Sequence, residues 1–500
     1  MTNLESTGSL WMNETARARF PALGTEPVNV DVIVVGGGIT GVTTALLLKE
    51  AGQRVALLEA AQVGAGVTSG TTAHLTEALD TRFHEVESKF GREGASLCAE
   101  SGRLAIEQIA SLVESYSIDC EFERLPGYLF ATDPEQREEL ERERAACERI
   151  GLRVESATPD LPLPVVAALR FENQGQFHPV AYVSALARTI PGNGSHLYEG
   201  TRVIAVEDGE PCRVYTGDGS VLSAPRVVLA THSPLNRVLL QTKIAAYRSY
   251  VISGPVKAAP QGLYWDLADP YHYIRRARVG DAVHLVVGGE DHKTGKDPEP
   301  GAFERLLSFA EPFGLTEATR RWSAQVVEPA DGLPFIGRNA ASEHVYVATG
   351  FSGNGMTFGT LAAIILTDAC VGKKSRFADL YEATRVKPVA SLPAYLLENV
   401  DFPLHLITDP LRPVDALSVE DIQPGKGAIT RVKGERLAVY RDSSGGLTAV
   451  SPICTHLGCH VKFNETEKSW DCPCHGSRFR VDGTVIDGPA VLALRRRALG

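Results

Sequence analysis

The stretch VNVDVIVVGGGITGVTTALLLKEAGQRVALLEA, residues 28–60, decides the fold of the N-terminal part of this chain. A near-continuous run of β-branched residues up to Val35 predicts a strand that is buried on both faces. A glycine-rich turn follows at once, a helical pattern runs to Lys49, and a second strand ends at Glu59. The Gly-x-Gly-x-x-Gly pattern is weak alone, but with this strand, helix and acidic residue it predicts a dinucleotide-binding unit.

The three glycines and the acidic residue of this unit each have a predicted role. Gly36 permits the tight turn, Gly38 lets a pyrophosphate approach the backbone, and Gly41 lets the helix pack on the strand. The helix N-terminus then faces the phosphates, and Glu59 is predicted to bind the ribose hydroxyls. This combination disfavours an ordinary βαβ unit without a ligand.

Two later stretches, DGLPFIGR (331–338) and VYVATGFSGNGMTFGTLAAIILTDACVG (345–372), indicate which dinucleotide is bound. The second predicts a strand, a Gly/Ser turn and a helix whose positive N-terminus suits the electron-rich edge of a reduced flavin. Together they resemble the closing motif of the D-amino-acid oxidase superfamily, which includes sarcosine, glycine and dimethylglycine oxidoreductases. The resemblance implies FAD as cofactor. The predicted contacts in this turn and helix start are Gly350, Gly353, Gly355, Met356 and, more weakly, Asn354.

Two further segments, GQFHPVAYVSALA (175–187) and RVVLATHSPL (226–235), resemble superfamily segments that lead back to the flavin. The resemblance implies a discontinuous α/β, Rossmann-like FAD-binding domain and a mixed-sheet substrate domain, which together make an α+β arrangement. An N-terminal extension (1–27) precedes this oxidoreductase unit (28–388). The predicted FAD-binding segments are 28–92, 175–245 and 325–388, and the predicted substrate segments are 93–174 and 246–324.

A second constellation lies near the C-terminus, in CTHLGC (454–459) and CPCHGS (472–477). Cys454-x-His456 and Cys472-x-x-His475 could bind zinc or an iron–sulfur cluster, and four ligands alone satisfy zinc. A Rieske centre explains more, because two thiolates hold one iron and two imidazoles hold the other, so that each half-motif supplies one of each.

Both loops resemble those of the Rieske proteins of respiratory and photosynthetic cytochrome complexes almost letter for letter. The resemblance implies a [2Fe–2S] cluster with Cys454, His456, Cys472 and His475 as ligands, and a disulfide between Cys459 and Cys474. It implies a small all-β Rieske domain at 416–500, after a proline-rich connector at 389–415. The whole chain is thus similar to bacterial FAD-dependent oxidoreductases fused to a C-terminal Rieske domain.

Candidate substrate contacts come from YHYIRR (271–276), which is predicted to be a strand. Alternation places Tyr271, Tyr273 and Arg275 on one face. The superfamily holds a substrate carboxylate with a tyrosine and an arginine of this strand, which implies catalytic-site roles for Tyr273 and Arg275. A strand with surface arginines is an alternative of about equal weight.

The segment TSGTTAHLTE (68–77) resembles the one that carries a histidine covalently linked to FAD in dimethylglycine and sarcosine dehydrogenases. His74 stands at the matching position, although Rieske-fused relatives often have lysine there. A non-covalent flavin contact is therefore favoured and the covalent one left open. Thr71 and Thr72 are predicted pyrophosphate or ribose contacts in either case.

Composition limits the classes of partner and location. A net charge of −11, with hydrophobic residues at 44% and charged residues at 22%, is typical of a globular protein and argues against nucleic acid as a partner. Neither a secretory signal nor an apolar run long enough for a membrane span is visible, so no integral membrane association is expected. Five scattered cysteines, namely Cys98, Cys120, Cys147, Cys212 and Cys370, suit a reducing cytoplasm.

These features predict a flavin-dependent dehydrogenase. It would oxidise a small amine or amino acid by hydride transfer to FAD and pass electrons singly through the cluster to a one-electron acceptor. The alternative is an electron-transfer flavoprotein whose cluster delivers electrons to FAD. A Rieske oxygenase is disfavoured because no 2-His-1-carboxylate iron site is apparent, and an NAD(P)H-linked reductase because there is no second strand-GxGxxG-helix unit.

Overall fold

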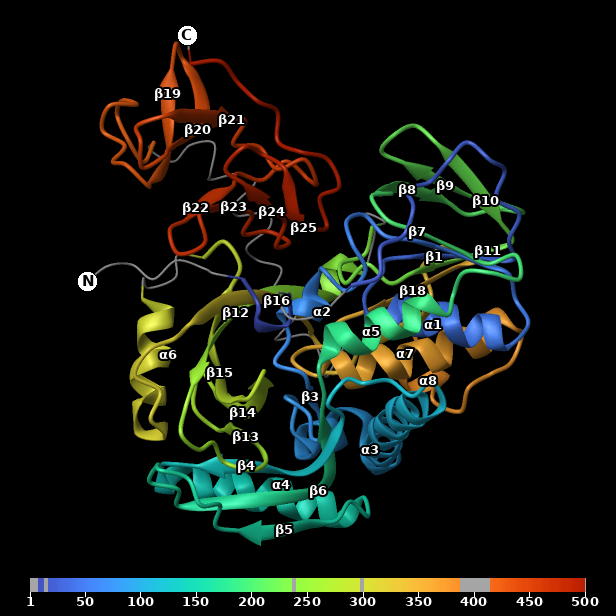
Figure 1. Ribbon diagram of the computed structural model, residues 1–500, viewed down its shortest axis with the longest axis vertical. Helices are drawn as coiled ribbons and strands as arrows, with labels where there is room; N and C mark the ends of the chain where they lie inside the picture. The colour runs from blue at the N-terminus through green and yellow to red at the C-terminus, as the bar shows by residue number, and fades with distance from the viewer. Residues whose placement is uncertain (1–7, 13–16, 236–239, 297–300, 387–413, 500) are drawn as a thin grey trace.

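The computed structural model describes residues 8–12, 17–235, 240–296, 301–386 and 414–499. Two sheet-based domains lie side by side, and a C-terminal domain lies against both (Figure 1). The predicted connector, 389–415, falls almost wholly outside the described residues, as do parts of the N-terminal extension. A short N-terminal 3₁₀ turn, η1 (Leu10–Met12), packs onto the first two domains.

The N-terminal βαβ unit forms as predicted and lies at the centre of a six-stranded sheet. β1 (Val32–Val35) is fully buried, and it pairs in parallel with β2 (Val55–Leu58) and with β11 (Arg226–Leu229). The strand order is β17-β18-β11-β1-β2-β7, with only the edge strand β17 antiparallel to its neighbour. The other strands are β7 (His196–Tyr198), β17 (Phe335–Arg338) and β18 (Val345–Thr349).

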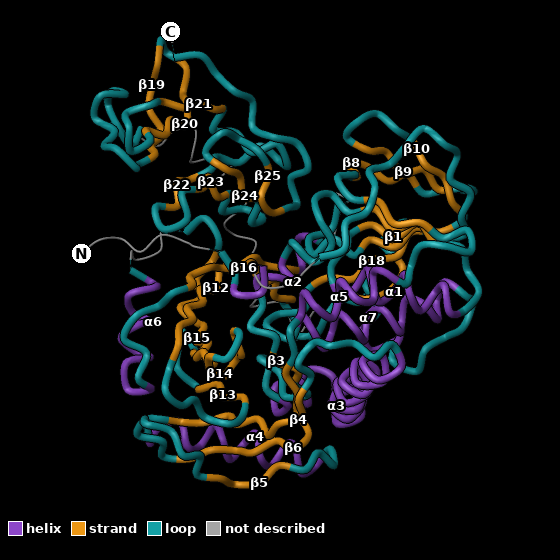
Figure 2. The backbone as a smooth tube through the Cα atoms, viewed as in Figure 1, coloured by secondary structure: helices purple, strands orange, loops and turns teal. Residues whose placement is uncertain are grey.

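Helices cover one face of this sheet (Figure 2). α7 packs against α1 and α3, so that the two glycine-turn helices lie side by side and begin at the same end of the sheet. A small antiparallel sheet of β8, β9 and β10 lies on the other side. The elements are α1 (Ile39–Glu50), α3 (Phe83–Ser115), α5 (Pro179–Arg188), α7 (Gly355–Cys370), α8 (Ala378–Tyr381), β8 (Val203–Glu207), β9 (Cys212–Thr216) and β10 (Val221–Ala224).

The second domain is built on a mixed nine-stranded sheet. Its order is β16-β12-β15-β14-β13-β4-β6-β3, and β5 pairs with β6. α6 covers β12 and β15, and α4 packs on β4, β5 and β6. The elements are β3 (His74–Leu75), β4 (Glu123–Ala131), β5 (Val154–Ala157), β6 (Ala167–Gln176), β12 (Ile244–Pro255), β13 (Leu263–Asp266), β14 (His272–Val279), β15 (Ala282–Lys293), β16 (Arg320–Pro329), α2 (Val67–Gly70), α4 (Arg137–Arg149) and α6 (Ala302–Ala310).

Two strands cross the predicted division between FAD-binding and substrate segments. β3 falls in the predicted FAD-binding segment 28–92, yet it pairs with β6 of the nine-stranded sheet. β16 runs through the predicted boundary at 325 and pairs with β12 along its whole length. The nine-stranded sheet therefore includes residues of the predicted FAD-binding segments, namely β3, well before the boundary at 92, and the end of β16, just after the boundary at 325.

The C-terminal domain is all-β, as predicted, and consists of two antiparallel sheets. Its core packs around the fully buried Trp470 and Phe479. The first sheet contains β19 (Gly427–Val432), β20 (Glu435–Arg441) and β21 (Leu447–Val450), and the second β22 (Lys462–Asn464), β23 (Ser469–Asp471), β24 (Arg478–Arg480) and β25 (Val485–Asp487). The predicted fold class, a Rossmann-like domain with a mixed-sheet domain and a small all-β domain, is confirmed.

Candidate functional site

The turn between β1 and α1 can exist only with glycine. Gly36 has φ +107°, and a Cβ there would lie 2.4 Å from the carbonyl oxygen of Ala230. A Cβ on Gly41 would lie 1.8 Å from the carbonyl oxygen of Gly36. Gly38 has more room, because a Cβ there would meet only the Thr68 hydroxyl, at 3.0 Å. The turn therefore exposes backbone N–H groups at a helix N-terminus, which is the cradle that a pyrophosphate needs.

Glu59 closes this cradle at the end of β2. Its two carboxylate oxygens accept hydrogen bonds from the N–H groups of Gly37 and Ala61, each at 2.7 Å. Burial raises the pKa of the carboxyl, and these two hydrogen bonds together with Arg202 oppose that shift. The side chain is thus held rigidly at the cavity edge, and its ribose-binding role remains a prediction.

A cavity of about 940 Å³ runs from this turn to the nine-stranded sheet. Its volume lies at the upper end of the range for small-molecule and cofactor sites, which suits a ligand as large as FAD. Gly41 and Gly350 do not line it, so they shape the two turns by close packing and positive φ. The predicted residues that do line it are Gly36, Gly38, Glu59, Thr71, Thr72, His74, Tyr273, Gly353, Asn354, Gly355 and Met356.

His74 lies in the cavity wall, at the start of β3. Its Nε2 lies 3.3 Å from the Ile274 carbonyl, which can only accept, so Nε2 carries the proton and Nδ1 accepts from the Thr72 hydroxyl at 3.0 Å. Burial, with Arg275 nearby, lowers the pKa of His74 to about 3. The ring is therefore neutral near pH 7, and a covalent bond at either nitrogen would replace one of these hydrogen bonds.

Arg275 has a different role from the predicted one. Its Nη1 donates to the carbonyls of Thr72 and Ala73, both at 2.9 Å, and to that of Phe177 at 3.3 Å. The side chain does not line the cavity, and its guanidinium packs over the Trp11 ring. Arg275 is thus a positioning residue for the turn that carries His74, because its Nη1 and Nε donors bind backbone carbonyls.

The sequence interpretation also missed Trp11. Its indole N–H donates to the Thr71 carbonyl at 2.6 Å, so the N-terminal extension buttresses the same turn. The signal was an apolar cluster, SLWM at 9–12, within an otherwise polar extension.

Asn354 lines the cavity, and both polar ends of its side chain also bind the loop opposite; its predicted flavin contact stays a prediction. Its amide donates to the Ala78 carbonyl at 3.0 Å and accepts from the Asp80 N–H at 3.2 Å. Both ends of the side chain are therefore used to fix the 78–80 loop against the start of α7. This loop brings Asp80, which the sequence interpretation missed, to Gly353, whose N–H donates to the Asp80 carboxylate at 2.5 Å.

Tyr273 faces the cavity as predicted, beside Tyr271. The Tyr273 hydroxyl is 2.5 Å from the Ser249 hydroxyl, and the two tyrosine ring centroids are 5.7 Å apart. Burial raises the pKa of both phenols, so they remain protonated at neutral pH.

The C-terminal loops bring the four predicted cluster ligands together. The Cys454 and Cys472 thiols interact directly, which lowers the pKa of Cys454 to about 7 and raises that of Cys472. The imidazole centroids of His456 and His475 are 5.0 Å apart and their rings are perpendicular. Backbone N–H groups of the same loops and the Ser477 hydroxyl point at the two sulfurs. Two thiolates, two imidazoles and sulfur-directed donors fit a Rieske cluster.

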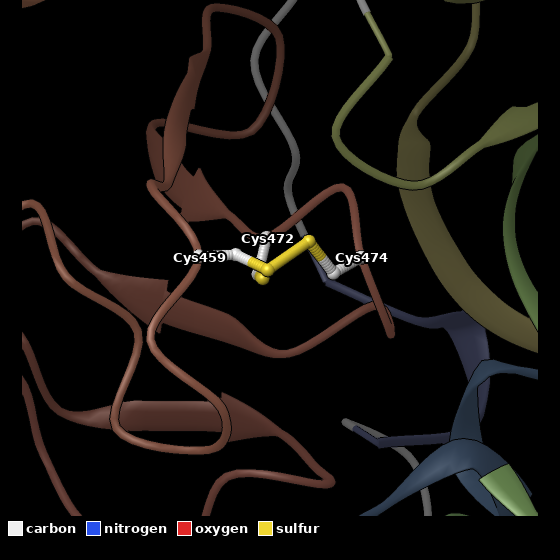
Figure 3. A group of neighbouring side chains, drawn as sticks. All are labelled: Cys459, Cys472 and Cys474. Carbon is white, nitrogen blue, oxygen red and sulfur yellow. A yellow bond between two sulfur atoms is a disulfide. The ribbon is translucent and has the colours of Figure 1, made fainter. Parts of the chain in front are cut away.

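The predicted disulfide between Cys459 and Cys474 is present. Figure 3 shows it beside Cys472, with the three sulfurs within 4.8 Å of one another. Because Cys459 and Cys474 are bonded to each other, neither can also supply a thiolate. The bridge therefore cross-links the two ligand loops at one of the ligands.

We expect Cys459→Ser to shorten the life of the cluster, because the loops lose a cross-link over 15 residues that stabilises by about 3 kcal/mol. The measurement is the rate at which cluster absorbance disappears on warming in a chelator, with the buried free cysteine variant Cys212→Ser as control. An unchanged rate in Cys459→Ser would show that the cluster alone holds the loops.

The C-terminal domain forms part of the cavity wall. Glu467, Arg478, Asp487, Gly488, Ala490 and Val491 line it together with the glycine turns. The ligand loop itself touches the nine-stranded sheet, where the Gln325 amide donates to the Gly476 carbonyl at 2.6 Å. A smaller space beside His475 is lined by residues of β12 and β16 together with Ser233, Pro234 and Gln241.

A buried ion-pair network fixes this contact. Arg248 of β12 binds Glu467 with Nη2 at 2.7 Å and Nε at 3.0 Å, and Arg478 binds the same carboxylate at 3.0 Å. The three side chains are 2%, 9% and 3% exposed. Burial raises the pKa of Glu467, but the two arginines outweigh it and lower the value to about 2, so the carboxylate stays charged.

Comparison with known proteins agrees with both parts of the chain. The family model for FAD dependent oxidoreductases (DAO) matches residues 31–369, and that for the Rieske [2Fe-2S] domain matches residues 412–496. YhfW, a Rieske 2Fe-2S iron-sulfur protein of Bacillus subtilis (strain 168), is 34% identical over 500 residues and 98% of each chain. Gamma-glutamylputrescine oxidoreductase of Escherichia coli (strain K12) is 27% identical over 381 residues, 70% of this chain and 86% of that protein.

Among solved structures, glycine oxidase from Geobacillus kaustophilus superposes with a TM-score of 0.62 at 22% identity, covering 71% of this chain and 99% of that one. This likeness shows the fold. Within the described residues, no helix combines the length and apolar character needed to cross a bilayer.

Proposed function

Because the chain belongs to the DAO family of FAD-dependent oxidoreductases and carries a C-terminal Rieske [2Fe–2S] domain, we propose that it oxidises a small amine or amino acid. The proposed reaction moves a hydride from the substrate to FAD and passes the electrons singly through the cluster to an acceptor. When bound, FAD supplies two-electron acceptance and the cluster one-electron transfer.

One observation supports the proposed electron route, namely that the FAD-binding domain and the Rieske domain line the same cavity. The glycine turns at Gly36 and Gly353 form one side, and Rieske residues from Glu467 to Val491 form part of the other. The ligand loop that ends at Ser477 is hydrogen-bonded to β16 through Gln325. A cluster held on this loop would therefore be close to a flavin in the cavity without any domain movement.

The substrate class rests on two supports. The relatives named above include an oxidoreductase of gamma-glutamylputrescine and, by fold, a glycine oxidase. The cavity wall near the start of β14 includes Trp265, Tyr271 and Tyr273, which would exclude water around a small substrate.

Residues of this chain have proposed supporting roles. Thr71, Thr72 and neutral His74 would contact the cofactor from the turn that Arg275 and Trp11 hold in place. Tyr273, oriented by Ser249, would face the substrate.

The test uses the full-length chain, since removing the Rieske domain would also open the cavity. Wild type and Cys472→Ala, both loaded with FAD, are mixed anaerobically with amines and amino acids. We expect flavin bleaching in both proteins, and in wild type a reduced-cluster electron paramagnetic resonance signal that follows it. Electron transfer to a one-electron acceptor should fall by about tenfold or more in Cys472→Ala, and Cys212→Ala should behave as wild type.

The order of reduction separates the two directions of electron flow. If no amine or amino acid bleaches the flavin, while an external one-electron donor reduces first the cluster and then the flavin, the chain is instead a reductase fed through the Rieske domain. Equal transfer to the acceptor in Cys472→Ala would show that electrons leave the flavin by another route.

A further inference from the structure

The carboxylate of Asp80 opens into the substrate end of the cavity. Asp80 lines this cavity and is exposed, although protein surrounds it closely enough for burial to raise its pKa. One carboxylate oxygen accepts the Gly353 N–H, which ties Asp80 to the turn before α7.

Two tyrosines lie near this carboxylate, whose charge acts on the phenols of Tyr271 and Tyr273. A Cβ placed on Gly353 would lie 2.7 Å from Asp80 Oδ2 and 3.2 Å from the Tyr271 hydroxyl, so the acid and the phenol meet at one point. Tyr273 lies next to Tyr271, and Trp265 lines the same cavity. A carboxylate among tyrosine and tryptophan rings attracts cations through charge and through the ring faces.

Arg82 is the arginine whose charge acts on Asp80, but its guanidinium donates to the Leu79 carbonyl at 2.9 Å and it does not line the cavity. The other described cationic side chains near this end have partners away from Asp80. Arg275 donates to backbone carbonyls outside the cavity, and Arg248 and Arg478 share the Glu467 carboxylate. Two other arginines line the cavity among the described residues. Burial raises the pKa of Glu59 and the charge of Arg202 opposes that rise, at the end of the cavity where the ribose is predicted to bind. Arg480 is an exposed residue of the Rieske strand β24.

We propose that the substrate is an amine that Asp80 and the rings of Tyr271, Tyr273 and Trp265 bind as a cation, and that it lacks an α-carboxylate. The bound ammonium must give one proton to the Asp80 carboxylate or to water before the neutral amine passes a hydride to FAD. This inference rests on the proposed function and narrows its substrate class from amines or amino acids to amines. A substrate carboxylate placed beside Asp80 would meet a like charge, and among the described residues no arginine that lines the cavity is directed at Asp80.

The first arm of the test compares matched pairs that differ only in the carboxylate, namely benzylamine with phenylglycine and isobutylamine with valine. With the FAD-loaded chain under anaerobic conditions, the amines are expected to bleach the flavin and the amino acids to leave it oxidised. Amino acids that bleach the flavin as fast as their matched amines would overturn the inference and leave the proposed function intact.

The second arm measures binding without turnover, by flavin absorbance changes and by the melting temperature of the FAD-loaded chain. Tetramethylammonium is expected to bind and acetate not to bind. Asp80→Asn, which keeps an acceptor for the Gly353 N–H, should weaken tetramethylammonium binding by at least about tenfold at unchanged FAD content. The exposed-residue variant Asp379→Asn should bind it like wild type.

The two arms of the test distinguish a failure of the proposed function from a failure of the cation site. If neither member of a pair bleaches the flavin, the proposed function fails, while preferential binding of tetramethylammonium would still support a cation site. Binding of acetate in preference to tetramethylammonium would overturn that site. If Asp80→Asn loses FAD, the cation site is tested by the comparison of tetramethylammonium with acetate in the wild-type protein.

Discussion

Gly41→Ala is expected to purify with little or no FAD. The added Cβ would lie 1.8 Å from the Gly36 carbonyl oxygen, which is a backbone atom and cannot rotate away. The helix must then move off the turn, at a cost of at least about 3 kcal/mol for such overpacking. If this free-energy cost applies only to the FAD-bound protein, the affinity for FAD drops about a hundredfold. The ratio of flavin to protein absorbance after purification, followed by titration with FAD, measures the loss.

Gly24→Ala provides the control, because a Cβ at Gly24 meets no atom within 4 Å. It should retain the flavin content of wild type. Full FAD content in Gly41→Ala would show that α1 can shift without losing the phosphate cradle.

Arg248→Met is expected to loosen the Rieske domain from the rest of the chain. Removing one partner of a buried ion pair leaves Glu467 with only Arg478, and such a loss costs about 3 kcal/mol. For a domain of this size, that cost lowers the melting temperature of the cluster-containing part by roughly 12–24 °C. Cluster absorbance and flavin fluorescence, followed separately during heating, would show which domain is affected.

The effect of Arg248→Met on the melting temperature should depend on pH in a definite direction. Glu467 has a pKa lowered to about 2, so its pairing stabilises the fold above its ordinary pKa and loses that effect as pH falls toward 2. The gap between wild type and Arg248→Met should therefore be largest near neutral pH and narrow in acid. Arg278→Met, at an exposed position on β14, is the control. A gap that stays constant with pH would mean that lost packing, and not lost charge pairing, causes the effect.

Local sequence was sufficient for the parts of this protein that depend on short-range backbone geometry. The β1 turn needs glycine at 36 and 41 because neighbouring backbone atoms leave no room for a side chain, and those glycines stand within six positions of each other. The Rieske ligands could be predicted in the same way, because each loop carries its cysteine and histidine two or three residues apart. The disulfide likewise joins positions only 15 apart. The order of the family motifs then predicted the three-part fold.

Tertiary structure alone decided which side chains meet across the domains. Arg275 binds the Thr72 carbonyl, 203 positions away, and Arg248 pairs with Glu467 at a separation of 219 positions. No local pattern in the sequence predicts such partners. Strand alternation placed Arg275 and Tyr273 on one face, but the length of the arginine side chain carries its charge past the cavity to backbone carbonyls. Asp80 had no signal of its own in the sequence. It became a candidate for substrate binding only when folding brought it to Gly353 and Tyr271, because the chemistry of a carboxylate depends on the groups that surround it.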